Sequence, residues 1–301
     1  MRRLIAIVAG MLGTALALAG CTASAAPARP TSVAAAHSSV TVQVAGTTRS
    51  FLLRSPAHRA TEKLPLVIAL HGAGGNAAAF ERYVGLDSLV AKQRLVMAYP
   101  NGSPLSGDHL AWNAGGCCSR QGMSPADDVG FLRVLIARVV ANDGVDARRV
   151  YLVGFSNGGM LAYRAACDLG DLIAGIVVVS GAYNVASCEQ RNAMPLDIVH
   201  GTADPTVPYG GGQQLNPSEI GLRPWTNRSV ADAVAAWRDR DACTASASVV
   251  RKGPVEEKFY RGCASGSDIA VYTVRGGDHS WPKPGTVDVA GLIAGMVNAT
   301  S

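Results

Sequence analysis

The sequence is poor in charged and aromatic residues, and it lacks patterns that mark several classes of protein. Of its 301 residues, 16% are charged, 6% are aromatic and 48% are hydrophobic. This composition argues against a disordered chain and fits a compact domain in an extracytoplasmic environment. The formal net charge is +5, but no run of Lys and Arg alternates with aromatic residues. Nucleic-acid binding therefore has little support.

Metal-binding patterns are also missing from the sequence. The seven cysteines contain no C-x-x-C spacing, and the six histidines do not stand at zinc-like intervals from them. We therefore expect no metal site.

The N-terminal residues have the order of a targeting segment. Two arginines precede an apolar stretch at residues 4–19, which is short for a membrane span and is followed by small residues. Residues 18–21 (Leu-Ala-Gly-Cys) resemble a bacterial lipobox, so we expect residues 1–21 to be a lipoprotein signal peptide with Cys21 as the lipidated residue. The alternative is cleavage at the Ala-Ser-Ala of residues 23–25, which would release a soluble secreted protein.

The rest of the chain is expected to contain a tether and one domain. Residues 22–39 are rich in Ala, Ser and Pro, which favours a flexible tether that attaches the domain to the membrane lipid. Residues 40–301 show no internal repeat and no second boundary, and the Gly- and Pro-rich residues 210–224 are interpreted as a loop or small lid.

Cysteine usage agrees with export. Without Cys21, an even set of six remains, which an exported protein would oxidise to disulfides. Cys243 and Cys263 flank a predicted hairpin, and we expect them to pair. The connectivity of the other four stays open: either Cys117 and Cys118 form a vicinal bridge or each has a distant partner, and the remaining two are Cys167 and Cys188.

Apolar runs and helical patterns alternate along the chain. The runs are short and rich in aliphatic residues, as in strands covered on both faces. Alternating residues at 40–54 predict a hairpin, and strands are predicted at 65–70, 94–99, 149–153, 173–180 and 196–199. Helices are predicted from about residue 127, from 157 and from 229, the last with Ser229 as its cap. This alternation predicts an α/β protein with a mostly parallel sheet and helices on both faces.

The motif Gly-Phe-Ser-Asn-Gly at residues 154–158 follows one of these strands and precedes a helix. That context is the one that a nucleophile elbow requires, because the glycines allow close approach of neighbouring chain at the serine. Ser156 is therefore the candidate nucleophile, and it needs a base that is oriented by a carboxylate.

Asp204 and His279 follow in the order serine, acid, histidine that is typical of α/β-hydrolases. Each lies just after a predicted strand, at the edge where parallel sheets bind their ligands. The alternatives are that Asp204 only begins an Asp-Pro turn and that His279 is a surface histidine. Asp278 is a rival acid, but its adjacency to the histidine suits it poorly to orient the imidazole.

The oxyanion donors are predicted in two segments. The loop His71–Ala77 follows the strand at 65–70 and is rich in small residues, so the Ala73 amide is one candidate. The second is the amide of Asn157, the residue after the nucleophile. We expect His71 itself to be structural, and the Asp127-Asp128 pair to form the first turn of a helix with a structural bond.

With these residues assigned, the chain resembles the polyhydroxybutyrate depolymerase and feruloyl esterase family, in particular its LpqC-like branch. The resemblance extends from about Val40 to the C-terminus and is carried by six motifs, at residues 71–76, 112–118, 127–131, 154–160, 200–209 and 276–282. It implies an α/β-hydrolase fold, a triad of Ser156, Asp204 and His279, a secreted enzyme and no cofactor. It also suggests that Trp281 lines the acyl site. Trp112 is a weaker candidate for substrate contact, with a structural role beside the cysteine pair as its alternative.

The expected function is therefore serine carboxylesterase activity on small or oligomeric esters, of the hydroxyalkanoate or the hydroxycinnamoyl type. Two alternatives remain: an acyltransferase or peptidase with the same triad, and a catalytically inactive surface-binding protein. The expected location is extracytoplasmic, with a lipid anchor in the membrane, and the sequence indicates no oligomeric state.

Overall fold

Strands and helices alternate along the central part of the folded unit, which spans Thr31 to Ser301. The computed structural model describes residues 32–106, 108–117, 126–189, 192–213 and 225–299. The strands are β1 (Ser32–Val33), β2 (Ala36–Val44), β3 (Thr47–Ser55), β4 (His58–Arg59), β5 (Leu64–Leu70), β6 (Val96–Pro100), β7 (Ser103–Ser106), β8 (His109–Ala111), β9 (Val145–Phe155), β10 (Gly175–Val179), β11 (Leu196–Gly201), β12 (Gly212–Gln213), β13 (Thr226–Asn227), β14 (Ser248–Lys252), β15 (Val255–Tyr260) and β16 (Ile269–Val274). The helices are α1 (Ala77–Val84), α2 (Ser88–Lys92), α3 (Asp128–Asn142), α4 (Asn157–Asp168), α5 (Val230–Arg240) and α6 (Val289–Ala299).

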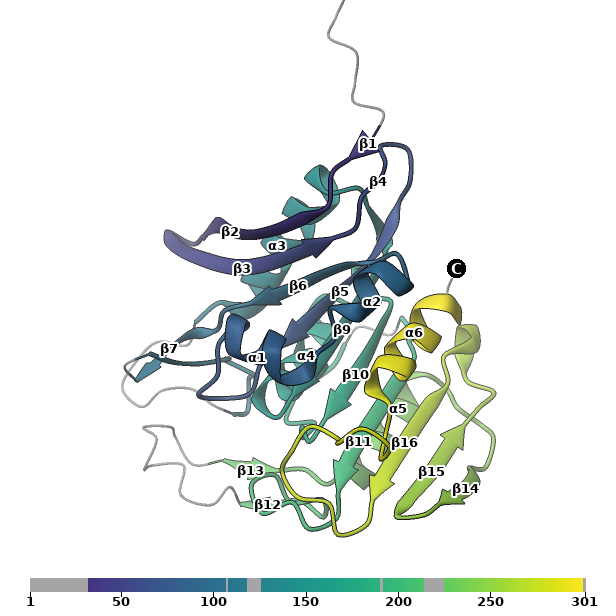
Figure 1. Ribbon diagram of the computed structural model, residues 1–301. Coiled ribbons are helices and arrows are strands. Elements are labelled where there is room, and N and C mark those ends of the chain that lie inside the picture. Colours follow the sequence, from purple (N-terminus) through teal and green to yellow (C-terminus); the bar gives the residue numbers. More distant parts are fainter. Residues whose placement is uncertain (1–31, 107, 118–125, 190–191, 214–224, 300–301) are drawn as a thin grey trace, which may run out of the picture. The chain divides into compact units, whose positions relative to one another are not determined.

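Ten strands form one sheet, in the order β14-β15-β16-β11-β10-β9-β5-β6-β3-β2 (Figure 1). The six strands from β16 to β6 are parallel, whereas β14 and β15 at one edge and β3 and β2 at the other are antiparallel. The strands β5, β6 and β10 are buried along their whole length, as their continuous apolar sequences require. The predicted α/β-hydrolase fold with a mostly parallel sheet is confirmed.

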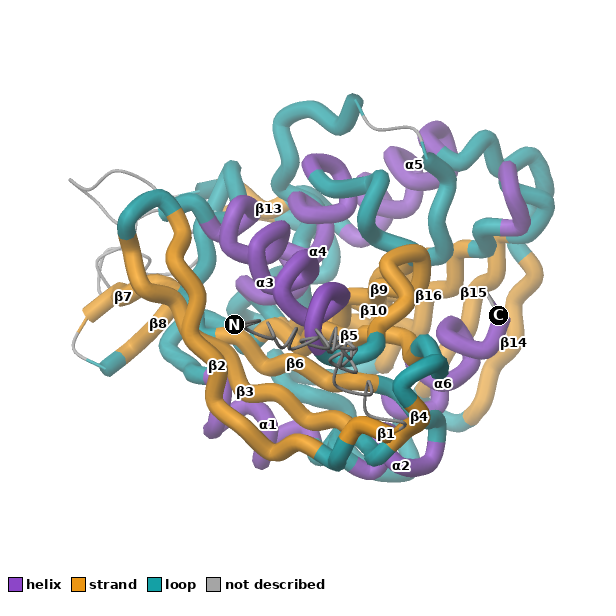
Figure 2. Tube along the Cα trace, turned by 90° about the horizontal axis from the view of Figure 1, so that it is seen from above, coloured by secondary structure: helices purple, strands orange, loops and turns teal. Residues whose placement is uncertain are grey.

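Helices cover both faces of the sheet, and the view from above separates the two layers (Figure 2). The helices α3, α4 and α5 bury their apolar residues in one core cluster, and α1, α2 and α6 bury theirs in a second. Ser229 caps α5 as predicted, accepting a hydrogen bond from the Asp232 amide at 3.0 Å. Among the helices of the described residues, none is long and apolar enough to cross a membrane.

The N-terminal hairpin begins earlier than the sequence predicts. Residues 36–39, which we expected in the tether, form the start of β2 and pair with the end of β3, with Ala36 opposite Ser55. Their own side chains carry no strand pattern, but the partner strand satisfies their backbone groups. The turn of the hairpin lies at Ala45 and Gly46, whose φ angles of 47° and 80° fit a tight two-residue turn.

Two disulfides lie in the described residues. The predicted Cys243–Cys263 bridge is present, and Cys167 pairs with Cys188, a connectivity that the sequence left open. Cys117 is also disulfide-bonded. Cys118 and the expected lipidation site Cys21 lie outside the described residues.

Candidate active site

The strand β9 ends at Phe155 and the helix α4 begins at Asn157, so Ser156 occupies a sharp turn between them. Its φ of 54° and ψ of −121° are strained for a residue with a side chain. The flanking glycines make this turn possible: a Cβ added at Gly154 would lie 2.3 Å from the Gly158 oxygen, and one added at Gly158 would lie 2.3 Å from the Leu70 oxygen. Ser156 therefore has the geometry of a nucleophile elbow.

The side chains of Ser156, His279 and Asp204 form one hydrogen-bonded chain. The Ser156 hydroxyl lies 2.9 Å from Nε2 of His279, and Nδ1 of His279 lies 2.7 Å from Oδ2 of Asp204. His279 follows β16 and Asp204 follows β11, so both come from the carboxyl ends of parallel strands. Asp278, the rival acid, is exposed, and its carboxylate accepts a hydrogen bond from the Ser280 hydroxyl.

Asp204 is held in its ionised form by two backbone amides and His279, and His200 lies close to it. Its Oδ1 accepts hydrogen bonds from the amides of Thr206 and Val207, both at 2.8 Å, and its Oδ2 lies 3.4 Å from Nε2 of His200 in addition to the contact with His279. Burial raises the pKa of this carboxyl, but the hydrogen bonds from His200, His279 and the Val207 amide outweigh burial and hold the pKa well below its ordinary value. A charged, oriented carboxylate is what the imidazole of a serine hydrolase requires.

His200 is a residue of this site that the sequence argument did not single out. Its imidazole is buried, and Nε2 donates a hydrogen bond to the Val207 carbonyl at 2.8 Å while lying near Asp204. It therefore braces the 201–207 turn that carries the acid. The sequence signals were its place directly after a predicted strand, four residues before Asp204, and at the start of the motif at residues 200–209.

The two candidate oxyanion donors lie in segments that contact each other. Asn157 is the first residue of α4, so its amide has no acceptor within the helix. Ala73 lies on the exposed loop after β5, and its amide makes no hydrogen bond to a described residue. A Cβ at Gly158 would lie 2.6 Å from the His71 oxygen, which shows how closely the elbow approaches this loop.

The His71 side chain binds backbone groups of two loops, the structural role that was predicted. Its Nδ1 donates to the Gly72 carbonyl at 2.8 Å and its Nε2 accepts from the Gly102 amide at 3.0 Å. The ring is therefore neutral, with its proton on Nδ1. Burial lowers its pKa to about 4, against the opposing effect of the hydrogen bond with Gly72. The imidazole thus stays neutral at physiological pH.

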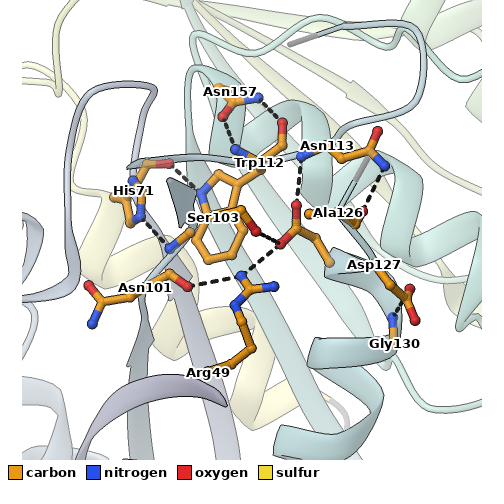
Figure 3. A network of polar contacts seen from close by, with 12 residues as sticks. Arg49, His71, Asn101, Ser103, Trp112, Asn113, Ala126, Asp127, Gly130 and Asn157 are labelled. Carbon is orange, nitrogen blue, oxygen red and sulfur yellow. Dashed lines mark hydrogen bonds and ion pairs between the residues drawn. The ribbon is translucent and has the colours of Figure 1, made fainter. Parts of the chain in front are cut away.

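The structure corrects the expectation for Trp112. Its side chain is fully buried, so it offers no surface to a substrate. The indole Nε1 donates to the His71 carbonyl at 2.8 Å, and the main chain of Trp112 is bound on both sides by the Asn157 side chain, at 2.7 Å to its amide and 2.9 Å to its carbonyl (Figure 3).

The buried ion pair of Arg49 and Asp128 holds the loop that contains Trp112. Asp128, the second residue of the predicted Asp-Asp pair, accepts hydrogen bonds from Arg49 at 2.7 Å, from the Ser103 hydroxyl at 3.2 Å and from the Asn113 amide at 2.7 Å (Figure 3). Asp127 caps α3 by accepting from the Gly130 amide at 2.8 Å. The sequence indicated the helix start but gave no sign of Arg49, which lies 79 residues away.

Aromatic rings gather around His279. The Phe155 ring centroid lies 5.1 Å from that of His279, and Trp281 packs edge-on against Phe155 and Phe80 at 6.4 and 5.8 Å. The Trp281 amide donates to the hydroxyl of Tyr83, a residue that is 54% exposed. Trp281, which was predicted to line the acyl site, thus packs against Phe155, whose ring lies next to His279.

The comparisons with known proteins agree with this geometry. Residues 49–206, just over half of the chain, match the family described as esterase PHB depolymerase. The chain belongs to that family. NocK of Nocardia uniformis subsp. tsuyamanensis, which is named as an esterase, is 32% identical over 259 residues, or 80% of this chain and 73% of NocK. Feruloyl esterase B of Piromyces equi is 28% identical over 72% of this chain, which spans 39% of that longer protein.

Solved structures show the same fold at low sequence identity. The acetyl xylan esterase from Aspergillus awamori superposes with a TM-score of 0.60 at 15% identity, covering 86% of this chain and 99% of its own. FphF, a fluorophosphonate-binding serine hydrolase of Staphylococcus aureus, does so with a TM-score of 0.56 at 12% identity, covering 88% and 100%. Family membership and fold together identify a carboxylic ester hydrolase of the serine hydrolase type.

Proposed function

We propose that Ser156, His279 and Asp204 are the nucleophile, base and acid of this esterase, and that the amides of Ala73 and Asn157 form its oxyanion hole. The observation that carries this assignment is the continuous chain of hydrogen bonds from Ser156 through His279 to Asp204. The strained conformation of Ser156 adds to it, since strained backbone is concentrated at functional sites.

Each step follows from these contacts. Nε2 of His279 takes the hydroxyl proton as Ser156 Oγ attacks the ester carbonyl, and the charged Asp204 stabilises the imidazolium that forms. The two amides stabilise the tetrahedral oxyanion. As the intermediate collapses, His279 returns the proton to the departing alcohol and leaves an acyl-enzyme. Water, deprotonated by His279, then releases the acid and regenerates Ser156.

We propose short hydroxyalkanoate or hydroxycinnamoyl esters as substrates. Relatives named as feruloyl esterases and the PHB depolymerase family support both classes. The Phe155 ring beside His279, with the Trp281 ring packed against it, favours an acyl group with a planar apolar part, because such a group would stack against aromatic rings.

The test uses the purified protein and its Ser156→Ala variant. We expect the wild type to cleave p-nitrophenyl esters, methyl ferulate or 3-hydroxybutyrate oligomers and to be labelled at Ser156 by a fluorophosphonate probe. The variant should lose both properties while remaining folded. Full esterase activity in the variant would refute the assignment, and absence of labelling in folded wild type would favour a binding protein. Acyl transfer to a sugar, or amide cleavage, would instead identify one of the other triad activities.

We further propose that the protein acts outside the cytoplasm, tethered by a lipid on Cys21. The apolar stretch and lipobox-like residues 18–21 support this location, as do the two disulfides. The first described strand, β1, begins at Ser32, and residues 22–31 separate it from Cys21 in the sequence. In a detergent phase-partition experiment, a Cys21→Ala variant should move from the detergent phase to the aqueous phase. Equal partition of both forms into the aqueous phase would support secretion of a soluble protein instead.

A further inference from the structure

Trp112 contacts both segments that carry the proposed oxyanion donors, one through its side chain and the other through its main chain. Its indole donates to the carbonyl of His71, two residues before Ala73, and its main chain is bound by the side chain of Asn157. These hydrogen bonds are buried and no longer than 2.9 Å. We propose that Trp112 is a positioning residue that sets the orientation of the two donors relative to each other. The inference rests on the proposed oxyanion roles of Ala73 and Asn157.

The first half of the argument concerns the Ala73 donor. A peptide unit is planar and trans, so the direction of the Gly72 carbonyl fixes the opposite direction of the Ala73 N–H. The Gly72 carbonyl is held by Nδ1 of His71 at 2.8 Å and by the Gly75 amide at 3.1 Å. The His71 ring lies against Trp112, with 4.8 Å between the ring centroids, so the indole restrains both the ring and the carbonyl of His71.

The second half concerns the Asn157 donor. The side-chain amide of Asn157 makes a pair of hydrogen bonds with the main chain of Trp112, as one strand does with another. Because the donor is the main-chain amide of the same residue, this pair limits how the first turn of α4 can rotate. The Asn157 side chain is buried, so these bonds do not compete with bulk water.

The rest of the network fixes Trp112 itself. The next residue, Asn113, donates its amide to Asp128, whose charge is matched by Arg49. This chain of contacts runs from Arg49 through Asp128 to the Trp112 loop and on to Asn157 and His71. Figure 3 shows Arg49, Asn113, Trp112, Asn157 and His71 within it. The oxyanion segments are thus tied to the hairpin strand β3 and to the helix α3, which are rigid parts of the fold.

The test compares two buried tryptophans that make the same kind of bond. Trp112→Phe removes the indole N–H that binds the His71 carbonyl. Trp237→Phe is the matched control, because the Trp237 indole is equally buried and donates to the Met194 carbonyl at 3.2 Å, in the core beneath α5. Active enzyme is counted in each preparation by the end-point of fluorophosphonate labelling.

We expect Trp112→Phe to lower kcat by roughly ten-fold to 10²-fold, with KM changed less than about three-fold. The loss of kcat should not exceed the loss caused by removal of one whole oxyanion donor. The affinity for an alkyl boronic acid, whose serine adduct is tetrahedral, should fall by a similar factor. Trp237→Phe should keep kcat and boronate affinity within about two-fold of the wild type. Asn157→Ala, which keeps the main-chain donor but removes its side-chain bonds, should resemble Trp112→Phe and serves if that variant does not fold.

Two results would overturn the inference. If Trp112→Phe behaves like Trp237→Phe, the indole bond has only a structural value. If KM rises while kcat and boronate affinity stay unchanged, Trp112 acts on the bound substrate and not on the transition state. Failure of the proposed serine mechanism, on which the oxyanion roles depend, is recognised separately, because activity would then persist in Ser156→Ala whatever the Trp112 variant shows.

Discussion

Replacement of Asp197 by Asn should stabilise this protein at neutral pH and have no such effect in acid. Asp197 lies on β11, between Val177 of β10 and Ala270 of β16. No described residue gives it a hydrogen bond or an ion pair, and burial raises its pKa from 3.8 to about 7. Its titratable neighbour Tyr272 offers no compensation, because burial and the charge of Asp197 both raise the pKa of that phenol, as does Glu257.

The sign and size of the effect follow from proton linkage. When folding raises the pKa of a carboxyl, the contribution of that group to stability is fully present below the pKa that it has in the unfolded chain. This contribution is lost as the pH rises from about 4 to about 7. The difference between 7 and 3.8 corresponds to an upper limit of about 4 kcal/mol, at ~1.36 kcal/mol per pH unit. The side chain is only partly buried, so we expect Asp197→Asn to gain about 1–3 kcal/mol at pH 8.

Urea unfolding of the oxidised protein between pH 4.5 and 8 measures this gain. The free energies of wild type and Asp197→Asn should be close at about pH 4.5 and diverge as the carboxyl ionises. Asp239→Asn is the control, because Asp239 is exposed on α5, and its curve should run parallel to the wild type. A constant difference between Asp197→Asn and wild type over the whole range would show that the carboxyl is not strained by its burial.

Two further predictions concern packing around the site. Asp128→Asn leaves the buried Arg49 without its counterion and should lower the free energy of unfolding, measured in urea, by about 3–5 kcal/mol. Glu62→Gln removes a charge from an exposed ion pair and should change this free energy little. Equal effects of the two substitutions would refute the structural role of the buried pair. Gly158→Ala should destabilise the protein and abolish esterase activity, because the new Cβ would lie 2.3 Å from the Leu70 oxygen. Gly295→Ala in α6 is the control: the new Cβ would meet open space, and alanine favours a helix over glycine, so the melting temperature should rise. An active, stabilised Gly158→Ala would contradict this account.

The fold could be predicted because its strands carry the signal locally. The continuous apolar runs at β5, β6 and β10 require burial on both faces, which in this size of chain means a parallel sheet between two helix layers. Elements without such a signal were missed or misplaced. The start of β2 is small and polar, and its strand conformation depends on pairing with β3. The short helix α2 has only five residues, too few for a periodic pattern.

The hydrogen-bonded arrangement of the proposed triad could be predicted for a related reason. Ser156 follows β9 directly, and Asp204 and His279 lie in the loops after β11 and β16, so their arrival at one edge of the sheet follows from the parallel order of the strands. The mutual distances did not need to be known, because the fold imposes them once the strand order is given. The chemistry of the site is in this sense encoded by short segments of sequence.

The positioning of that chemistry is encoded over longer separations. The sequence left Trp112 open between a substrate contact and a structural role, because a tryptophan in a glycine-rich loop gives no sequence signal that separates an exposed ring from a buried one. What places it inside the protein is a set of partners 41 and 45 residues away, His71 and Asn157, together with the Arg49–Asp128 pair across 79 residues. Each partner alone is unremarkable in sequence. A residue such as Asn157 can thus have a local role through its main-chain amide and a non-local role through its side chain, and only the first follows from the motif that contains it.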